Sequence, residues 1–196
     1  RGQQHGHLVL GGGIQIEDSN FWAQSDNVSM FHEFAISQPA GARFLLPTLN
    51  LSVRRDVWEQ VGGMDESFPG AAGEDSDWTI RMRQAGVPLY FDPSAMVRHA
   101  PARTTWADLV KHWRQSGHNN IRVRVRHAAE YNSPNFAQNP GWLRLLAPLI
   151  ALQVTAKIYK QRSFWRYWAS LPVVWATKVV YCWGAAEGIE NGFAFG

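Results

Sequence analysis

Short apolar runs separated by glycine and proline fill the first hundred residues of the chain. The run Leu8–Ile16 predicts a strand, and Asn50–Arg55 predicts a short extended piece. Two further strands are predicted close together, at Val87–Phe91 and Met96–His99, with Asp92-Pro93 ending the first of them. Strands that alternate with helical stretches are typical of an α/β domain.

Helical stretches lie between and after these strands. Four are predicted, at Trp22–Ile36, Arg55–Val61, Asp75–Ala85 and Thr105–Ser116. Glycine follows the last three, at Gly62-Gly63, Gly86 and Gly117, and glycine readily takes the left-handed conformation that ends a helix. A threonine at the start of the fourth helix is suited to cap its first turn.

The pattern changes after residue 140, where two long segments are apolar and aromatic. Trp142–Tyr159 and Phe164–Ala186 each contain one proline and two cations, which interrupt runs that are otherwise long enough to cross a bilayer. Tryptophan and tyrosine near their ends are typical of membrane interfaces. We therefore expect amphipathic helices that lie in the membrane surface. The alternative is two core helices that pack on a partner domain.

Composition and charge exclude several classes of protein. Hydrophobic residues make up 45% of the 196-residue chain and charged residues 18%, which excludes a disordered chain. The net charge of +3 and the pI near 9.2 are too mild to indicate nucleic-acid binding by themselves, but they suit anionic lipid or a diphosphate-bearing substrate. The single cysteine, Cys182, excludes an intrachain disulfide and fits a reducing compartment.

Three acidic residues, Glu74, Asp75 and Asp77, gather where a glycine-rich loop meets a predicted helix. A helix N-terminus stabilises negative charge, so these carboxylates are expected to stay ionised. An ionised carboxylate in a cleft accepts a proton from a hydroxyl nucleophile or holds a cation. The alternative is simple capping of the helix by Asp75, with acidic neighbours in the first turn.

The acidic motif belongs to an ordered series of motifs. In chain order these are Asn50–Arg55, Val61–Phe68, Gly73–Trp78, Arg81 with Gly86, and His99. The series resembles family 2 glycosyltransferases of the GT-A fold, in which an Asn-apolar-Ser-x-Arg-Arg strand precedes a Gly-Gly-Phe-Asp-Glu turn, a Glu-Asp-x-Asp motif and a strand ending in histidine. Met64 stands where the family has phenylalanine. The resemblance covers residues 8–125, and several linked motifs are far more specific than one.

The resemblance implies roles on the acceptor side of the reaction. Asp75 is the expected general base, which takes the proton of the acceptor hydroxyl as that hydroxyl attacks the anomeric carbon. Glu74, Asp77 and Trp78 are expected to bind the acceptor, and Asp77 also to fix the loop. The implied acceptor is a glycan or a lipid-linked molecule, for a surface glycan or glycolipid.

The resemblance also implies roles on the donor side. His99 is the expected ligand of the Mn²⁺ or Mg²⁺ ion that neutralises the leaving diphosphate. Arg103 is the expected cofactor-binding residue, and the implied donor is a nucleotide-sugar. One carboxylate on the acceptor side and a metal on the donor side suffice for a single displacement, so the enzyme is expected to invert the anomeric centre.

The expected organisation is a partial GT-A, Rossmann-like α/β domain followed by amphipathic, membrane-associated helices. Residues 1–130 are the acceptor-side part of that domain, 131–141 a linker and 142–196 the apolar, aromatic-rich region. The family's donor Asp-x-Asp follows a hydrophobic strand, whereas Asp75-Ser76-Asp77 follows glycine. The donor motif and the nucleotide-binding half are therefore expected upstream of Arg1, and this chain alone is expected to be inactive.

Two other functions stay open. The Arg122–Arg126 run could follow the phosphates of a nucleic acid, but no aromatic ladder interleaves with it and apolar helices follow directly. Anionic lipid or a lipid diphosphate suits it better, and no nucleic-acid partner is expected. The second alternative is a noncatalytic, membrane-associated binding module that has kept the fold. The expected location is the cytoplasmic face of the cell membrane.

Overall fold

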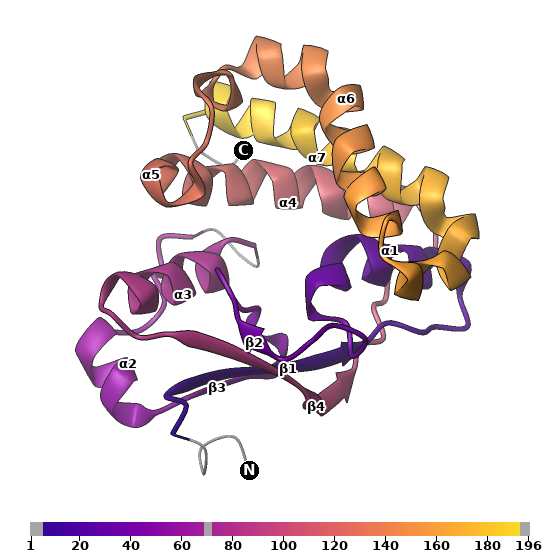
Figure 1. The fold of residues 1–196 in the computed structure, drawn as a ribbon. Coiled ribbons are helices and arrows are strands. Elements are labelled where there is room, and N and C mark those ends of the chain that lie inside the picture. Colours follow the sequence, from indigo (N-terminus) through magenta and orange to yellow (C-terminus); the bar gives the residue numbers. More distant parts are fainter. Residues whose placement is uncertain (1–5, 69–71, 193–196) are drawn as a thin grey trace. The chain divides into compact units, whose positions relative to one another are not determined.

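A computed structural model describes residues 6–68 and 72–192, which fall into two compact units (Figure 1). Unit 1 comprises residues 1–16, 33–68 and 74–99, and unit 2 comprises residues 17–32, 69–73 and 100–196. Residues 100–130, which the sequence pattern places with the first domain, thus have most of their contacts in unit 2. The domain boundaries at 130 and 141 stay a prediction.

Unit 1 is built on a four-stranded mixed sheet with the strand order β2-β4-β1-β3. Its strands are β1 (Val9–Gln15), β2 (Gly41–Ala42), β3 (Leu51–Val53) and β4 (Leu89–Arg98). β4 runs parallel to β1, whereas β2 is antiparallel to β4 and β3 is antiparallel to β1. The predicted α/β class is confirmed, and a mixed sheet with helices is compatible with part of a glycosyltransferase domain.

β4 joins two segments that the sequence predicts as separate strands. Its first part pairs with β1 as far as Asp92, opposite Gly12, and pairing resumes with Met96 opposite Gly13. The residues between leave the ladder as a bulge, so the proline that predicts a strand end is accommodated inside the strand. A side chain at residue 12 would not fit, because a Cβ there would lie 2.0 Å from the carbonyl oxygen of Ala95.

Two helices of unit 1 match the predicted segments. α2 spans Arg55–Val61 and ends at Gly62, and α3 spans Glu74–Gln84 and is followed by Gly86. Both glycines have positive φ, of 80° and 81°, as the predicted helix ends require. Because the chain reverses at Gly86, α3 and β4 run in opposite directions (Figure 1). The fully buried core side chains of this unit include Val9, Ile14, Leu46, Ile80, Met82, Leu89 and Phe91.

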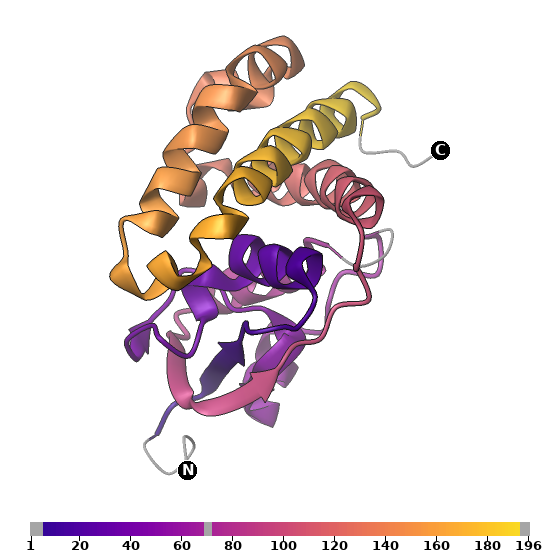
Figure 2. The ribbon, with the colours of Figure 1, turned by 90° about the vertical axis from the view of Figure 1, so that its right-hand side faces the viewer.

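Unit 2 is helical over its described residues. Its helices are α1 (Phe21–Phe31), α4 (Trp106–Arg126), α5 (Ala128–Tyr131), α6 (Pro140–Tyr159) and α7 (Leu171–Glu190), with 3-10 segments η4 (Asn135–Gln138) and η5 (Arg162–Ser170). α7 packs along both α4 and α6 and lies between them (Figures 1 and 2). The last segment predicted as one helix, Phe164–Ala186, is divided in the structure into the 3-10 segment η5 and the helix α7.

The predicted end of the fourth helix at Gly117 is wrong, because α4 continues to Arg126. Gly117 is buried where a Cβ would lie 2.0 Å from the carbonyl oxygen of Tyr181, and a Cβ on Gly184 of α7 would lie 1.9 Å from the carbonyl oxygen of Arg114. These glycines allow the backbones of the two helices to touch. The predicted cap is confirmed, since the Thr105 hydroxyl accepts a hydrogen bond from the backbone of Asp108 at 3.3 Å.

Among the described residues, α6 alone is long and apolar enough to cross a membrane by length and composition. α7 instead carries a row of buried small residues, which includes Gly184, Ala185 and Ala186. It therefore serves as the central helix of unit 2. Membrane association stays a prediction.

Candidate functional site

Asp75 lies in the first turn of α3, in unit 1. Its Oδ1 accepts hydrogen bonds from the backbone nitrogen of Ser76 at 2.7 Å and from the Ser76 hydroxyl at 3.3 Å. Burial raises the pKa of the Asp75 carboxyl above its ordinary value of 3.8, and the charge of Glu74 raises it further, although backbone hydrogen bonds from Ser76 and Thr48 lower it. A carboxylate with a raised pKa is a stronger base than an ordinary aspartate.

The pKa of Asp75 is raised, whereas a position at a helix N-terminus alone predicts a lowered pKa. Position in the first turn favours the ionised form, and the hydrogen bonds to the carboxylate act in the same direction. Loss of water around the carboxyl and the adjacent like charge of Glu74 outweigh both effects. The sequence shows the neighbouring charge, but burial depends on tertiary packing.

Two of the three other acceptor-side candidates in α3, Asp77 and Trp78, hold the turn that follows α2. Asp77 is fully buried, and its Oδ2 accepts a hydrogen bond from Nε of Arg81 at 2.9 Å. The terminal nitrogens of Arg81 and Nε1 of Trp78 donate to the three carbonyl oxygens of the turn Val61–Gly63, at 2.7 to 2.9 Å. Two motifs that are separate in the sequence thus form one structural piece. Acceptor binding by Glu74, Asp77 and Trp78 stays a prediction.

Asn50 ties β1 to β4 at the bulge. Its Nδ2 donates to the carbonyl oxygen of Gly13 at 3.2 Å and to that of Ala95 at 2.8 Å. Asn50 ends a short 3-10 segment, η3 (Thr48–Asn50), whose first residue provides a backbone hydrogen bond to Asp75. Asn50 therefore connects the bulge of β4 to β1, and the 3-10 segment that it ends contacts Asp75 through Thr48. Asn50 belongs to a motif in the sequence, but the pattern assigns it no role.

His99 directly follows β4, whose last residue, Arg98, pairs with Gln15 of β1. Since α3 and β4 run in opposite directions, Asp75 and His99 both lie toward the end of unit 1 at which β4 finishes. In residues 6–68 and 72–192, no three His, Cys, Asp or Glu side chains gather as a metal site. The described residues therefore do not by themselves complete a site for a Mn²⁺ or Mg²⁺ ion around His99.

Arg103 lies in unit 2, where a buried acid holds it. Its Nε donates to Oδ2 of Asp26 at 2.6 Å, and Oδ1 of the same carboxylate accepts a hydrogen bond from Nε1 of Trp113 at 2.8 Å. The amine of Lys178 lies 4.2 Å from the centroid of the Trp113 ring. Asp26 is fully buried in α1. Asp26 could not be identified from the sequence, because no pattern distinguishes a buried acid in the middle of a helix from a solvated one.

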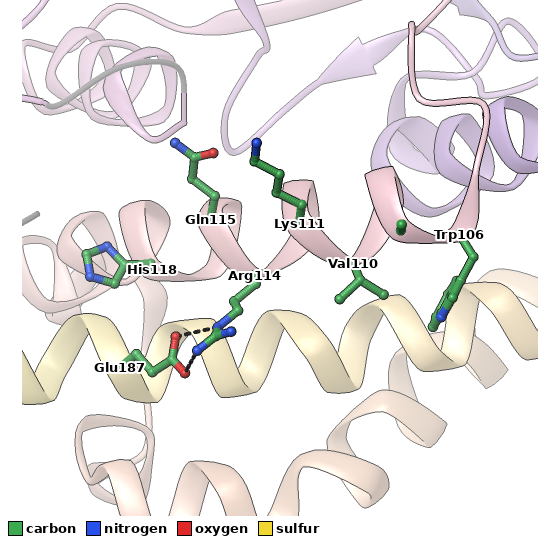
Figure 3. Close-up of a pocket in the computed structure, with 8 residues that line it drawn as sticks. Trp106, Val110, Lys111, Arg114, Gln115, His118 and Glu187 are labelled. Carbon is green, nitrogen blue, oxygen red and sulfur yellow. Dashed lines mark hydrogen bonds and ion pairs between the residues drawn. The ribbon is translucent and has the colours of Figure 1, made fainter. Parts of the chain in front are cut away.

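A pocket of about 580 Å³ opens along α4 in unit 2 (Figure 3). Trp106 lines it at one end, and Arg114 makes two hydrogen bonds to Glu187 of α7, at 2.6 and 2.8 Å. Figure 3 shows Lys111 and Gln115 pointing away from α7. The guanidinium of Arg114 and the carboxylate of Glu187 at the pocket are thus paired with each other. The pocket lining contains none of the residues to which the sequence assigns chemistry.

Comparison with known proteins adds one similarity. No protein-family model matches the chain, and no solved structure is significantly similar to it. Over 117 residues, 59% of its length, the chain is 30% identical to Glycosyltransferase AglE of Haloferax volcanii. The matched part spans 36% of the length of that protein. The chain therefore contains a glycosyltransferase-related region.

Proposed function

We propose that the chain is the acceptor-side part of an inverting, metal-dependent glycosyltransferase of family 2 with a GT-A fold, in which Asp75 is the general base. The observation that carries this proposal is the environment of Asp75. Its carboxyl lies at the start of α3, its pKa is raised by burial and by Glu74, and backbone and hydroxyl donors of neighbouring residues orient it. The glycosyltransferase-related region of the chain supports the reaction class.

In the proposed step, the acceptor hydroxyl oxygen attacks the anomeric carbon of a nucleotide-sugar. A glycosidic bond forms, and the bond from that carbon to the diphosphate oxygen breaks, with its electron pair leaving on the diphosphate. The hydroxyl proton passes to the Asp75 carboxylate, so no covalent enzyme intermediate is needed. Single displacement inverts the anomeric configuration. The acceptor would be a hydroxyl of a glycan or glycolipid.

Other residues of the chain are proposed to position or bind. Asp77 and Trp78 would hold the loop around the acceptor through Arg81 and the turn Val61–Gly63. Arg103, fixed by Asp26, would face the phosphates of the donor. His99 would contribute one ligand to Mn²⁺ or Mg²⁺, whose remaining ligands, like the rest of the nucleotide site, would come from outside the described residues.

Asp75→Asn in the full-length protein tests the proposal. The change keeps the size and a hydrogen-bond acceptor but removes the base, so turnover should fall by about 10²- to 10⁴-fold. Donor affinity, measured by calorimetry, should stay within about twofold, because a ground-state contact is not removed. Glu59→Gln on the exposed surface of α2 is the matched control, and should leave both values unchanged.

Two results would contradict the proposal. Unchanged turnover in Asp75→Asn would exclude Asp75 as the base. A full-length parent protein that binds a nucleotide-sugar but transfers it to no hydroxyl acceptor would favour the noncatalytic binding module.

A further inference from the structure

α6 is apolar on two opposite faces. Its inner face packs in unit 2 through the buried residues Leu143, Ala147, Ala151, Thr155 and Ile158. Its outer stripe consists of Leu145, Leu149 and Leu152, which are 58–67% exposed. A surface helix of a soluble domain normally presents charged or polar residues on its outer face, so this stripe indicates a second apolar environment.

The turn that follows α6 adds aromatic and basic side chains. In this basic aromatic turn, residues 160–168, Trp165 is 59% exposed and Trp168 is 74% exposed. Nε1 of Trp165 donates to the carbonyl oxygen of Tyr159 at 2.8 Å, so the indole N–H is satisfied within the protein. The guanidinium of Arg162 lies 6.0 Å from the centroid of the Trp165 ring. Tryptophan beside arginine is the composition that favours the headgroup region of a bilayer.

The charge of this part of the chain has one sign. Residues 131–186 contain six Lys and Arg residues and no Asp or Glu. Lys160, Arg162 and Arg166 of the turn are exposed, although Arg166 also pairs with Glu17 at 3.1 Å. An exposed apolar stripe next to the exposed cations Lys160 and Arg162 matches an anionic lipid surface in both properties.

We propose that the outer stripe of α6 and the basic aromatic turn together bind the surface of an anionic lipid bilayer, with α6 lying in the plane of the interface. α7 takes no part, because it packs between α4 and α6. An in-plane orientation preserves the packing of α6 on α7, including the hydrogen bond from Nε1 of Trp175 to the carbonyl oxygen of Pro148 at 3.2 Å. The proposal is independent of the glycosyltransferase reaction.

Co-sedimentation of the full chain with vesicles tests this proposal. Binding to vesicles that contain phosphatidylglycerol should exceed binding to pure phosphatidylcholine by at least about tenfold, and should fall with added salt. Trp168→Ser and Arg162→Glu should each weaken binding to the anionic vesicles by roughly tenfold. Both residues are on the surface, so the variants should keep the parent's circular dichroism and melting temperature.

Matched controls lie in unit 1. Trp58→Ser removes a tryptophan that is 52% exposed, and Arg55→Glu makes the same charge reversal on α2. Neither should change vesicle binding. Equal binding to neutral and anionic vesicles, or equal losses in the controls, would overturn the proposal. Concentration-dependent dimerisation that Trp168→Ser abolishes, without vesicle binding by the parent, would assign the surface to a second copy of the chain and also overturn it.

Discussion

Arg81 and Asp77 form an ion pair within one turn of α3, with Nε of Arg81 2.9 Å from Oδ2 of Asp77. The aspartate side chain is fully buried, whereas that of Arg81 is 27% exposed. Arg81 therefore links the buried Asp77 carboxylate to the turn Val61–Gly63, because its two terminal nitrogens donate to backbone carbonyl oxygens of that turn. The helix whose first turn contains the candidate base is thus fixed to the preceding motif by the side chains of Arg81 and Trp78.

Asp77→Asn should destabilise the protein by about 2–4 kcal/mol, because removal of one partner leaves the other charge partly buried and uncompensated. Urea denaturation followed by circular dichroism measures the change. Glu59→Gln on exposed α2 should change stability by no more than about 0.5 kcal/mol. A loss of similar size in the control, or none in Asp77→Asn, would show that the pair does not stabilise the native state.

Asp75→Asn should increase stability at neutral pH. Because the pKa of Asp75 is raised on folding, the folded protein binds this proton more tightly than the unfolded chain. The resulting stabilisation is fully present below the unfolded pKa and is lost as pH rises through the folded pKa. Asparagine mimics the neutral acid, so the variant should melt higher than the parent at neutral pH, and the difference should close below about pH 4.

Asp56→Asn offers a comparison of opposite sign, because a hydrogen bond from Arg54 lowers the pKa of Asp56. This variant should not gain stability at neutral pH. Calorimetric melting across the pH range measures both variants. A gain that persists unchanged at low pH would mean that packing, and not ionisation, causes the effect at Asp75.

Gly117→Ala should destabilise unit 2 by at least about 2 kcal/mol, since a Cβ would lie 2.0 Å from a backbone oxygen of α7 and the helices would have to separate. The loss would occur although alanine favours a helix by about 1 kcal/mol over glycine. Gly63→Ala is the control, because its nearest neighbouring atom is 3.8 Å away. Chemical denaturation of both variants gives the comparison, and equal stabilities would exclude a close α4–α7 contact.

Trp113→Phe should cost about 1–3 kcal/mol, because the Asp26 carboxylate loses one of its two donors and the smaller ring fills less of a buried site. Trp183→Phe is the matched control, since Trp183 is half exposed on α7. Thermal unfolding of the two variants should differ clearly. If the two losses are equal, the hydrogen bond to Asp26 contributes nothing measurable.

The 196-residue chain should bind Mn²⁺ only weakly, in about the millimolar range or above, because no three ligating side chains gather among residues 6–68 and 72–192. Isothermal titration calorimetry measures this affinity. Micromolar binding that disappears in His99→Ala, but persists in His112→Ala, would show that this chain completes a metal site by itself.

Local patterns predicted the elements of unit 1 well. The glycines after α2 and α3 mark both helix ends, because each has the positive φ that such an end requires. Gly117 follows a similar pattern and yet lies inside α4. Its role depends on the backbone of α7, more than sixty residues away in sequence, and no local pattern contains that contact.

Local sequence patterns also predict the candidate site only in part. The acidic motif, Asn50 and His99 stand out in the sequence, and the structure places them in one unit. The raised pKa of Asp75 and the burial of Asp77 could not be predicted, since both depend on which surfaces pack against α3. Asp26 was missed altogether, because only the fold brings it to Arg103 and Trp113.

The position of α7 between α4 and α6 sets the order in which unit 2 can form during synthesis. On the ribosome, α4 and α6 emerge before Leu171–Glu190, and both then lack the helix on which they pack. Until that last segment leaves the exit tunnel, their apolar faces stay open to chaperones or to a nearby bilayer. The strands and helices of unit 1, which end at His99, have all been synthesised before α7 emerges. The helical unit 2 is therefore the part of the protein that completes its packing last.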